Sequence, residues 1–106
     1  MTESPKDWSF TSHVGEDLRE MNLAEADLRR AIFDNADLEG ANLSGANLRD
    51  ASLKRANLMK AALDGADLRG AKMIKARLGF SNLQGARLDG TDMRGIRGKY
   101  AVWRDA

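Results

Sequence analysis

Leucine and alanine recur at a fixed spacing of five along most of this chain. When residues 16–95 are written in groups of five, the third position is Leu in thirteen of the sixteen groups. The first position is Ala in every group from Ala26 to Ala76, the second is usually Asp or Asn, and the fifth is Gly in seven groups. The repeating unit, which we call a pentad, therefore has two apolar and three mostly polar positions.

A period of five fits neither a helix nor a flat strand. On an α-helix, five residues turn by about 500°, so successive Leu side chains drift around the cylinder by about 140°. On a strand, an odd spacing puts successive Leu side chains on opposite faces. An Ala/Leu-rich helix is also disfavoured because each Gly inside it costs about 1 kcal/mol. The chain must turn a corner in every pentad, and four corners close a square coil of twenty residues.

Residues 16–95 therefore predict four stacked coils with Leu and Ala inside and the other three positions outside. Gly suits the corner because it accepts backbone angles that a Cβ forbids, and Asp or Asn can hydrogen-bond locally at such turns. Ala at the first position leaves room for Leu in a narrow interior. The predicted core consists of the sixteen third-position residues: Leu18, Leu23, Leu28, Phe33, Leu38, Leu43, Leu48, Leu53, Leu58, Leu63, Leu68, Met73, Leu78, Leu83, Leu88 and Met93.

This pattern resembles that of the pentapeptide-repeat family, A(D/N)LXX, over about three quarters of the chain. The resemblance implies an all-β fold, the right-handed quadrilateral β-helix, with about four coils here. Departures lie at the ends, where Glu16 and Met21 replace Ala in the first coil and Thr91 replaces it in the last. These replacements leave the two inward columns intact.

The remaining segments are predicted to cover the two open ends of the coil. Residues 1–15 are interpreted as an N-terminal cap, in which Trp8 and Phe10 cover the first coil, because exposed strand edges need covering. Residues 96–106 are interpreted as a C-terminal cap or a dimerisation segment. Its apolar side chains are Tyr100, Val102 and Trp103.

Composition narrows the classes of function. The 106 residues include 17 basic and 16 acidic side chains, a balance that argues against a dedicated nucleic-acid binder. The sequence has no Cys, and its single His, His13, lies before the repeat. We therefore expect no metal site and no His-based catalytic site. A solid core leaves no deep pocket, so we expect no enzyme activity, cofactor or small-molecule substrate. The apolar runs are too short for a membrane helix, and the N-terminus lacks an apolar signal core, which favours a cytoplasmic protein.

When coils of twenty residues stack, outward residues twenty positions apart lie above one another. The outward positions therefore form four faces, one for each pentad of a coil. The first face, centred on Leu18, Leu38, Leu58 and Leu78, begins with acidic residues and ends with outward Met59 and Phe80. The second is nearly uncharged. The third carries an Arg column interpreted as a solvated salt-bridge ladder or, alternatively, an anion contact. The fourth is basic and is either a plain solvated surface or a contact for nucleic acid or an acidic partner. The candidate contact residues are Arg29, Arg49 and Arg69 on the third face, Lys54, Lys72 and Lys75 on the fourth, and the aromatic residues Phe80, Tyr100 and Trp103.

Function is predicted only at the level of class. The leading hypothesis is a non-catalytic structural or protein-interaction module that binds another protein or forms a homodimer through its C-terminal end. Charge also changes along the axis, from six acidic and three basic residues in 16–35 to five acidic and ten basic in 56–106. The family resemblance implies an alternative, a DNA-mimic modulator of DNA gyrase, which the mixed surface charge disfavours. A second alternative is weak nucleic-acid or anion binding through the basic face.

Overall fold

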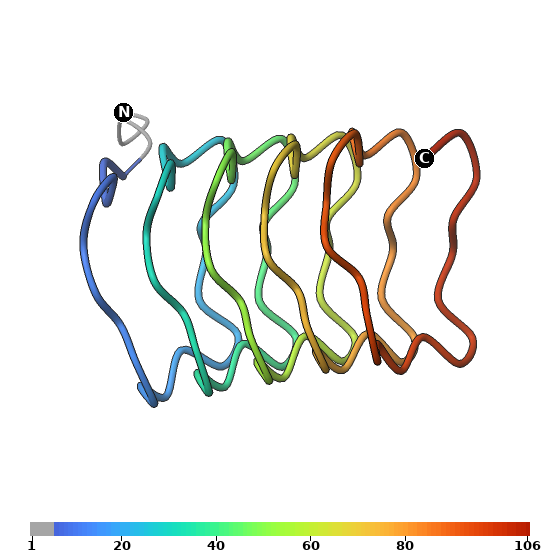
Figure 1. Ribbon diagram of the computed structural model, residues 1–106, viewed down its shortest axis with the longest axis horizontal. Coiled ribbons are helices and arrows are strands. Elements are labelled where there is room, and N and C mark those ends of the chain that lie inside the picture. The colour runs from blue at the N-terminus through green and yellow to red at the C-terminus, as the bar shows by residue number, and fades with distance from the viewer. Residues whose placement is uncertain (1–5) are drawn as a thin grey trace.

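The computed structural model describes residues 6–106, and the pentad is its structural unit throughout (Figure 1). Each pentad has one bridging residue at its second position and a turn at its fourth and fifth positions, and this pattern runs unbroken over residues 6–105. At twenty residues per coil, these one hundred residues form five coils of a right-handed, four-sided β-helix. The described part of the chain contains no helix and no strand longer than one bridging residue.

The coil extends further at both ends than the sequence predicted. The sequence predicts an N-terminal cap before residue 16 and a C-terminal cap or dimerisation segment after residue 95. Residues 6–15 and 96–105 instead form further pentads with the same bridges and turns. The first five residues of the predicted N-terminal segment lie outside the described residues.

Parallel bridges connect each coil to the next. Sixteen bridges join second-position residues twenty apart, from Asp7–Asp27 to Asn82–Val102. Three N–H groups of a pentad point along the axis to neighbouring coils, as the pentad 46–50 illustrates. The Asn47 N–H donates to the preceding coil, at Ala26 O (2.9 Å). The N–H groups of Leu48 and Asp50 donate to the next coil, at Asp67 O (2.7 Å) and Arg69 O (3.1 Å).

Every corner has the same backbone conformation. The N–H of the first residue of a pentad donates to the third residue of the pentad before it, as in Ala51 N to Leu48 O at 3.0 Å. The fifth residue has a positive φ in all twenty pentads, which is the signature of a type II turn. Eight of these residues are Gly, and the other twelve adopt φ values from 57° to 64°.

Asp and Asn are preferred at the second position because their side chains accept a hydrogen bond from the N–H of the fourth residue. This N–H points outward and has no backbone acceptor in the described coils. In the pentad 41–45, Asn42 Oδ1 accepts from the Ser44 N–H at 3.0 Å, and the same bond recurs wherever Asp or Asn occupies this position. The predicted local hydrogen bonding is confirmed.

The interior is filled by the first and third positions. Fourteen of the sixteen predicted central residues are buried, and Leu88 and Met93 are half-buried because no further described coil covers them. Ser81, which replaces Ala in the interior, is buried and its hydroxyl donates to Leu78 O at 2.6 Å. No buried side-chain nitrogen or oxygen among the described residues lacks a hydrogen-bond partner.

At the N-terminal end, Trp8 and His13 occupy inward third positions. Their rings stack at 4.2 Å, and the His13 ring also stacks on Phe33 at 5.3 Å. The two residues therefore extend the core by half a coil, with His13 inside the repeat rather than before it. Phe10 lies at a corner and is 67% exposed, so it does not cover the end as predicted.

At the C-terminal end, Trp103 covers part of the last coil. It packs against the core, and a Cβ added at Gly98 would lie 3.0 Å from its Cζ2 atom. The indole thus uses the space that Gly98 leaves at the third position of its own pentad. Tyr100 and Val102 point outward and are exposed, so they do not cap the coil.

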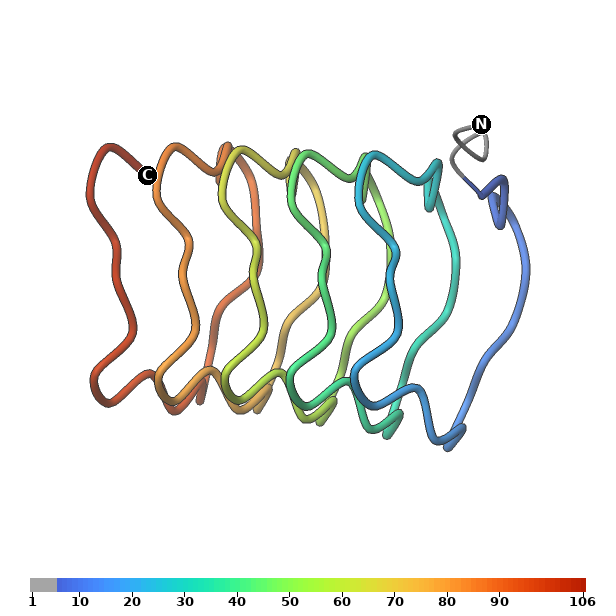
Figure 2. The same ribbon diagram turned by 180° about the vertical axis from the view of Figure 1, so that it is seen from behind.

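The five coils form a short rod that measures 37 × 26 × 24 Å. The first and the last described coils lie at opposite ends of the long axis, as the front and back views both show (Figures 1 and 2). No helix in residues 6–106 is long and apolar enough to cross a membrane.

Candidate interaction surfaces

The Arg column of the third face is held by carboxylates. Arg29 forms a bidentate pair with Asp27 (Nε–Oδ1 2.8 Å, Nη2–Oδ2 2.6 Å), and Arg69 forms the same pair with Asp67 (2.9 and 2.7 Å). Arg49 has Asn at the second position of its own pentad, and its Nε lies 3.8 Å from Asp67 Oδ2 of the next coil. This arrangement is a salt-bridge ladder, in which two of the three guanidinium groups already bind a carboxylate.

The same Asp-x-Arg pair occurs in four pentads and shifts the ionisation of its carboxyl group. On the first face, Arg19 donates to Asp17 from Nε (2.9 Å) and Nη2 (2.8 Å). The Arg19 side chain, and then its backbone N–H, lower the pKa of Asp17 to about 2. Hydrogen bonds from the Arg side chain likewise lower the pKa values of Asp27, Asp67 and Asp92. All four carboxylates stay charged well below neutral pH.

The basic residues of the fourth face are less completely paired. Asp92 binds Arg94 in the bidentate manner, and Asp34 accepts from the Ser52 hydroxyl at 2.6 Å. Lys54, Lys72 and Lys75 form no ion pair with the described residues. Lys54 and Lys75 line a shallow hollow with Asp34, Asn35, Arg55 and Ile74.

The basic surface continues around the corner onto the first face. A second hollow is lined by four cationic side chains and one glycine: Arg55, Lys75, Gly95, Arg77 and Arg97. No carboxylate lines it. This corner therefore concentrates positive charge in the C-terminal half of the rod.

An aromatic cluster lies at the other edge of the first face. Phe80 and Tyr100 are vertical neighbours whose rings stack at 5.0 Å with an interplanar angle of 28°. Both are more than half exposed, and with Met59 they line an open hollow rimmed by Arg77, Arg97 and Lys99. The Arg77 Nη2 atom lies 3.1 Å from Met59 Sδ. Phe80 and Tyr100 thus form one cluster, whereas Trp103 belongs to the core.

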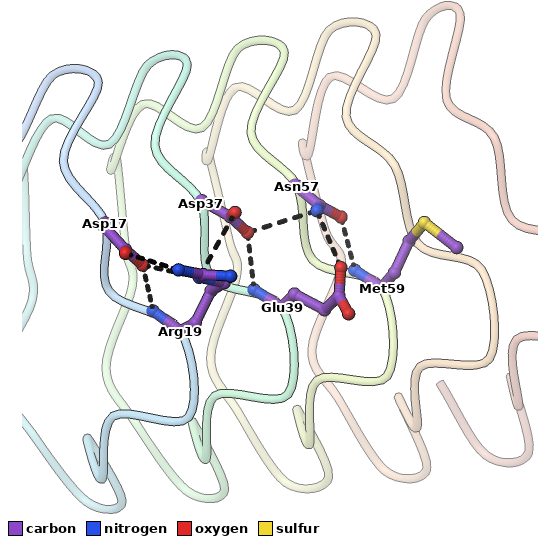
Figure 3. A network of polar contacts seen from close by, with 6 residues as sticks. All are labelled: Asp17, Arg19, Asp37, Glu39, Asn57 and Met59. Carbon is purple, nitrogen blue, oxygen red and sulfur yellow. Dashed lines mark hydrogen bonds and ion pairs between the residues drawn. The ribbon is translucent and has the colours of Figure 1, made fainter.

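The N-terminal half of the first face carries an acidic network (Figure 3). Arg19 bridges Asp17 and Asp37, with its Nε 3.8 Å from Asp37 Oδ2. Asn57 Nδ2 donates to both Asp37 Oδ1 (3.2 Å) and Glu39 Oε1 (3.3 Å). The Arg19 guanidinium group thus contacts carboxylates of two coils, and the network ends at Asn57 in the middle coil.

Sequence reasoning missed Arg97 and Lys99 as members of the first face. The repeat predicted from the sequence ends at Gly95, so residues 96–100 belong to the predicted cap or dimerisation segment and not to a fifth pentad of this face. The signal was present, because Ile96 and Ala101 stand at first positions and Trp103 stands at a third position. Residues 96–100 have Gly98 at the third position, where the pentads of residues 16–95 have Leu, Phe or Met, so this pentad does not match the pattern.

The sequence matches the family model of pentapeptide repeats, in eight copies, over residues 17–50, 36–73 and 61–97. Among solved structures, it is similar to a pentapeptide repeat protein, Rfr23, from the cyanobacterium Cyanothece 51142. The identity is 41%, the TM-score is 0.76, and the match covers 77% of this chain and 56% of that one.

Two further structures match with lower TM-scores. AT2G44920, a pentapeptide repeat protein from the Arabidopsis thaliana thylakoid lumen, is 33% identical (TM-score 0.42; 86% of this chain, 60% of that chain). Trypsin-treated QnrB1, a plasmid-mediated fluoroquinolone resistance protein, is 20% identical (TM-score 0.39; 92% and 60%).

The matched chains are longer than this one, which spans about 56–60% of their lengths. No curated protein matches the sequence significantly. The matched residues 17–97 carry the same inward columns and corner turns that the structure shows. The chain belongs to the pentapeptide-repeat family.

Proposed function

We propose that the protein is a non-catalytic interaction module that binds a protein partner through its first face. The observation that carries this proposal is the cluster of the exposed Phe80 and Tyr100 with the half-buried Met59, rimmed by Arg77 and Lys99. Aromatic residues, Met and Arg are enriched at protein interfaces, and Tyr and Arg also among the residues that contribute most binding energy.

The physical setting supports the same surface. A stacked aromatic pair on a flat, rigid coil presents apolar area without ordering a flexible loop, so little conformational entropy is lost on binding. Both rings remain more than half exposed in the isolated chain, and burying them against a partner releases ordered water. The surrounding cations then act as a polar rim that selects a partner by charge.

The test is capture of partners from a cell lysate on the immobilised chain. The variant carries Phe80→Ser and Tyr100→Ser, and the matched control carries Phe10→Ser, an exposed aromatic residue at another corner. We expect at least one protein to be retained by the wild type and the control and to fall by about tenfold or more on the double variant. Equal retention on all three baits would contradict the proposal, as would no specific retention together with no self-association of the chain.

A further inference from the structure

Charge reverses along the first face. Its first two pentads, 16–20 and 36–40, contain five acidic residues and one basic residue, whereas its last two, 76–80 and 96–100, contain three basic residues and no acidic one. The second-position column shows the reversal most clearly, and its members in axial order are Asp17, Asp37, Asn57, Arg77 and Arg97. Two negative side chains, one neutral side chain and two positive side chains follow each other one coil apart.

This order is symmetric about the middle coil. From Asn57, the carboxylates lie one and two coils towards the N-terminal end, and the guanidinium groups lie at the same distances towards the other end. A second copy turned end for end and placed face to face puts Asp37 against Arg77 and Asp17 against Arg97, each pair occurring twice. Asn57 and Met59 then meet their own counterparts across the two-fold axis, as an isologous interface requires.

We propose that the first face binds a second copy of this chain in an antiparallel, two-fold dimer. The inference rests on the proposed function, in that it names the partner of the same surface. It differs from a dimer formed at the C-terminal end, because the contact lies along the whole side of the rod.

Charged side chains at both ends of the first face lack opposite charges within residues 6–106 of the isolated chain. The acidic half has one cation, Arg19, for its five carboxylates. Arg77 contacts Met59 Sδ, and among the described residues neither Arg77, Arg97 nor Lys99 has an ion pair. Antiparallel docking gives both sets an opposite charge, whereas parallel docking places like charges together at a cost of several kcal/mol.

The fourth and fifth positions follow the same arrangement. Phe80 faces Gly40 of the partner subunit, over which a Glu20 carboxyl lies, and Tyr100 faces Glu20 of the partner subunit. Two kinds of like-charged contact remain: Arg19 lies opposite Lys99 at two symmetry-related sites, and Lys60 meets its own counterpart. The bidentate bond to Asp17 offsets part of the charge of Arg19. The docking therefore matches opposite charges along the second-position column, and this match carries the proposal.

The area of the first face limits how strongly two copies can associate. Five coils about 4.8 Å apart make a face roughly 24 Å long. The short dimensions of the rod are 26 and 24 Å, so the two faces together bury on the order of 1,100 Å². This area lies at the lower end of specific interfaces, and we expect reversible association that is stronger at low salt, because much of it is electrostatic.

Two charge reversals test the arrangement by sedimentation equilibrium at low salt. Asp37→Arg and Arg77→Asp each put like charges together at two symmetry-related sites, so each variant alone is expected to self-associate about 100-fold more weakly than the wild type. A mixture of the two variants restores opposite charges at both sites, and its dimer is expected to form within about threefold of the wild-type constant. A contact that pairs the coil of Asp37 with the coil of Arg77 predicts this rescue, whereas a contact at the end of the rod does not.

Matched controls lie on other faces. Arg87→Asp and Asp92→Arg change second-position charges on the third and fourth faces, and we expect both variants to dimerise as the wild type does. Circular dichroism checks that all variants fold, and Arg is compatible with the second position because residues 77 and 87 already carry it.

Three outcomes would overturn the inference. The first is a wild type that stays monomeric at about 1 mM. The second is a dimer that ignores both reversals but is lost on Trp103→Ser, which would place the contact at the end of the rod. The third is a monomer that binds a single-stranded oligonucleotide through Arg77, which would make the basic half a nucleic-acid surface. A monomeric wild type that still captures a lysate protein through Phe80 and Tyr100 would overturn this dimer but leave the proposed function standing.

Discussion

The fifth residue of each pentad makes the strictest demand on side-chain identity, because its φ is positive in every described pentad. For residues other than Gly this conformation costs roughly 1 kcal/mol each. Twelve pentads nevertheless carry a side chain there, and several of these lie over a glycine of the next coil. A Cβ at Gly40 would be 2.7 Å from Glu20 Cδ, whereas a Cβ at Gly65 would meet no atom within 4 Å. Glycine therefore serves both the backbone angle and the neighbour's side chain.

The residue-scale prediction separates these two roles. Gly65→Ala is expected to cost about 1 kcal/mol in the free energy of unfolding, from the backbone conformation alone. Gly40→Ala is expected to cost more, because the Glu20 carboxyl must also move. Urea denaturation measures both changes, and adding Glu20→Ala should bring the Gly40→Ala cost down to that of Gly65→Ala. If Gly40→Ala and Gly65→Ala have equal costs in the protein that retains Glu20, the Glu20 side chain does not disfavour a Cβ at residue 40.

At the scale of the pentad, the Asp-x-Arg pair couples the turn to pH. The second-position carboxylate accepts the fourth-position N–H and binds the fourth-position guanidinium, so one side chain stabilises both the turn and the surface charge. The pKa of Asp17 in the folded protein is about 2, below its ordinary value of 3.8. A lowered pKa means that the native state binds this proton less readily than the unfolded state. The contribution is therefore complete above pH 3.8 and is lost as the pH falls towards 2.

The corresponding prediction concerns the acid limb of stability. The difference in urea midpoint between the wild type and Asp17→Asn is expected to be constant above about pH 5 and to shrink as the pH falls from 4 to 2. Arg19→Gln removes the partner and should flatten the same part of the curve. A midpoint difference that stays constant down to pH 2 would show that the pair does not lower this pKa.

At the scale of the whole molecule, each coil contacts only the coils directly before and after it. Stability in such arrays is close to a sum of local and nearest-neighbour contributions, so the coils at the ends are held from one side only. The hydrogen bonds themselves are alike, since Asn57 N–Ala36 O is 2.9 Å and Val102 N–Ser81 O is 2.8 Å. A difference in protection between these amides must therefore come from their place along the rod.

Native-state hydrogen exchange tests this prediction. We expect the Val102 amide to exchange at least about 100-fold faster than the Asn57 amide, because the last coil opens without opening the centre. Trp103→Ala should increase the exchange of Val102 and leave Asn57 nearly unchanged. Equal exchange of the two amides would mean that the rod opens only as a unit.

The pentad, the corner and most of the core were predictable because they depend on short spacings in the sequence. A Leu at every fifth residue requires a corner, and the constant offset of twenty stacks the inward residues from Leu18 to Leu83 in columns. The same reasoning stopped short at the ends, where Trp8, His13, Gly98 and Trp103 occupy third positions.

The sequence by itself determined the five-residue period, the two inward columns and the local role of the second-position Asp and Asn, since all of these are decided within one pentad or by a constant offset of twenty. Only the tertiary structure decided how far the coil extends, because an existing coil offers its N–H and C=O groups to a pentad of almost any composition. The same is true of the first face. Arg97 completes the column that begins at Asp17 because the rod has five coils and not four.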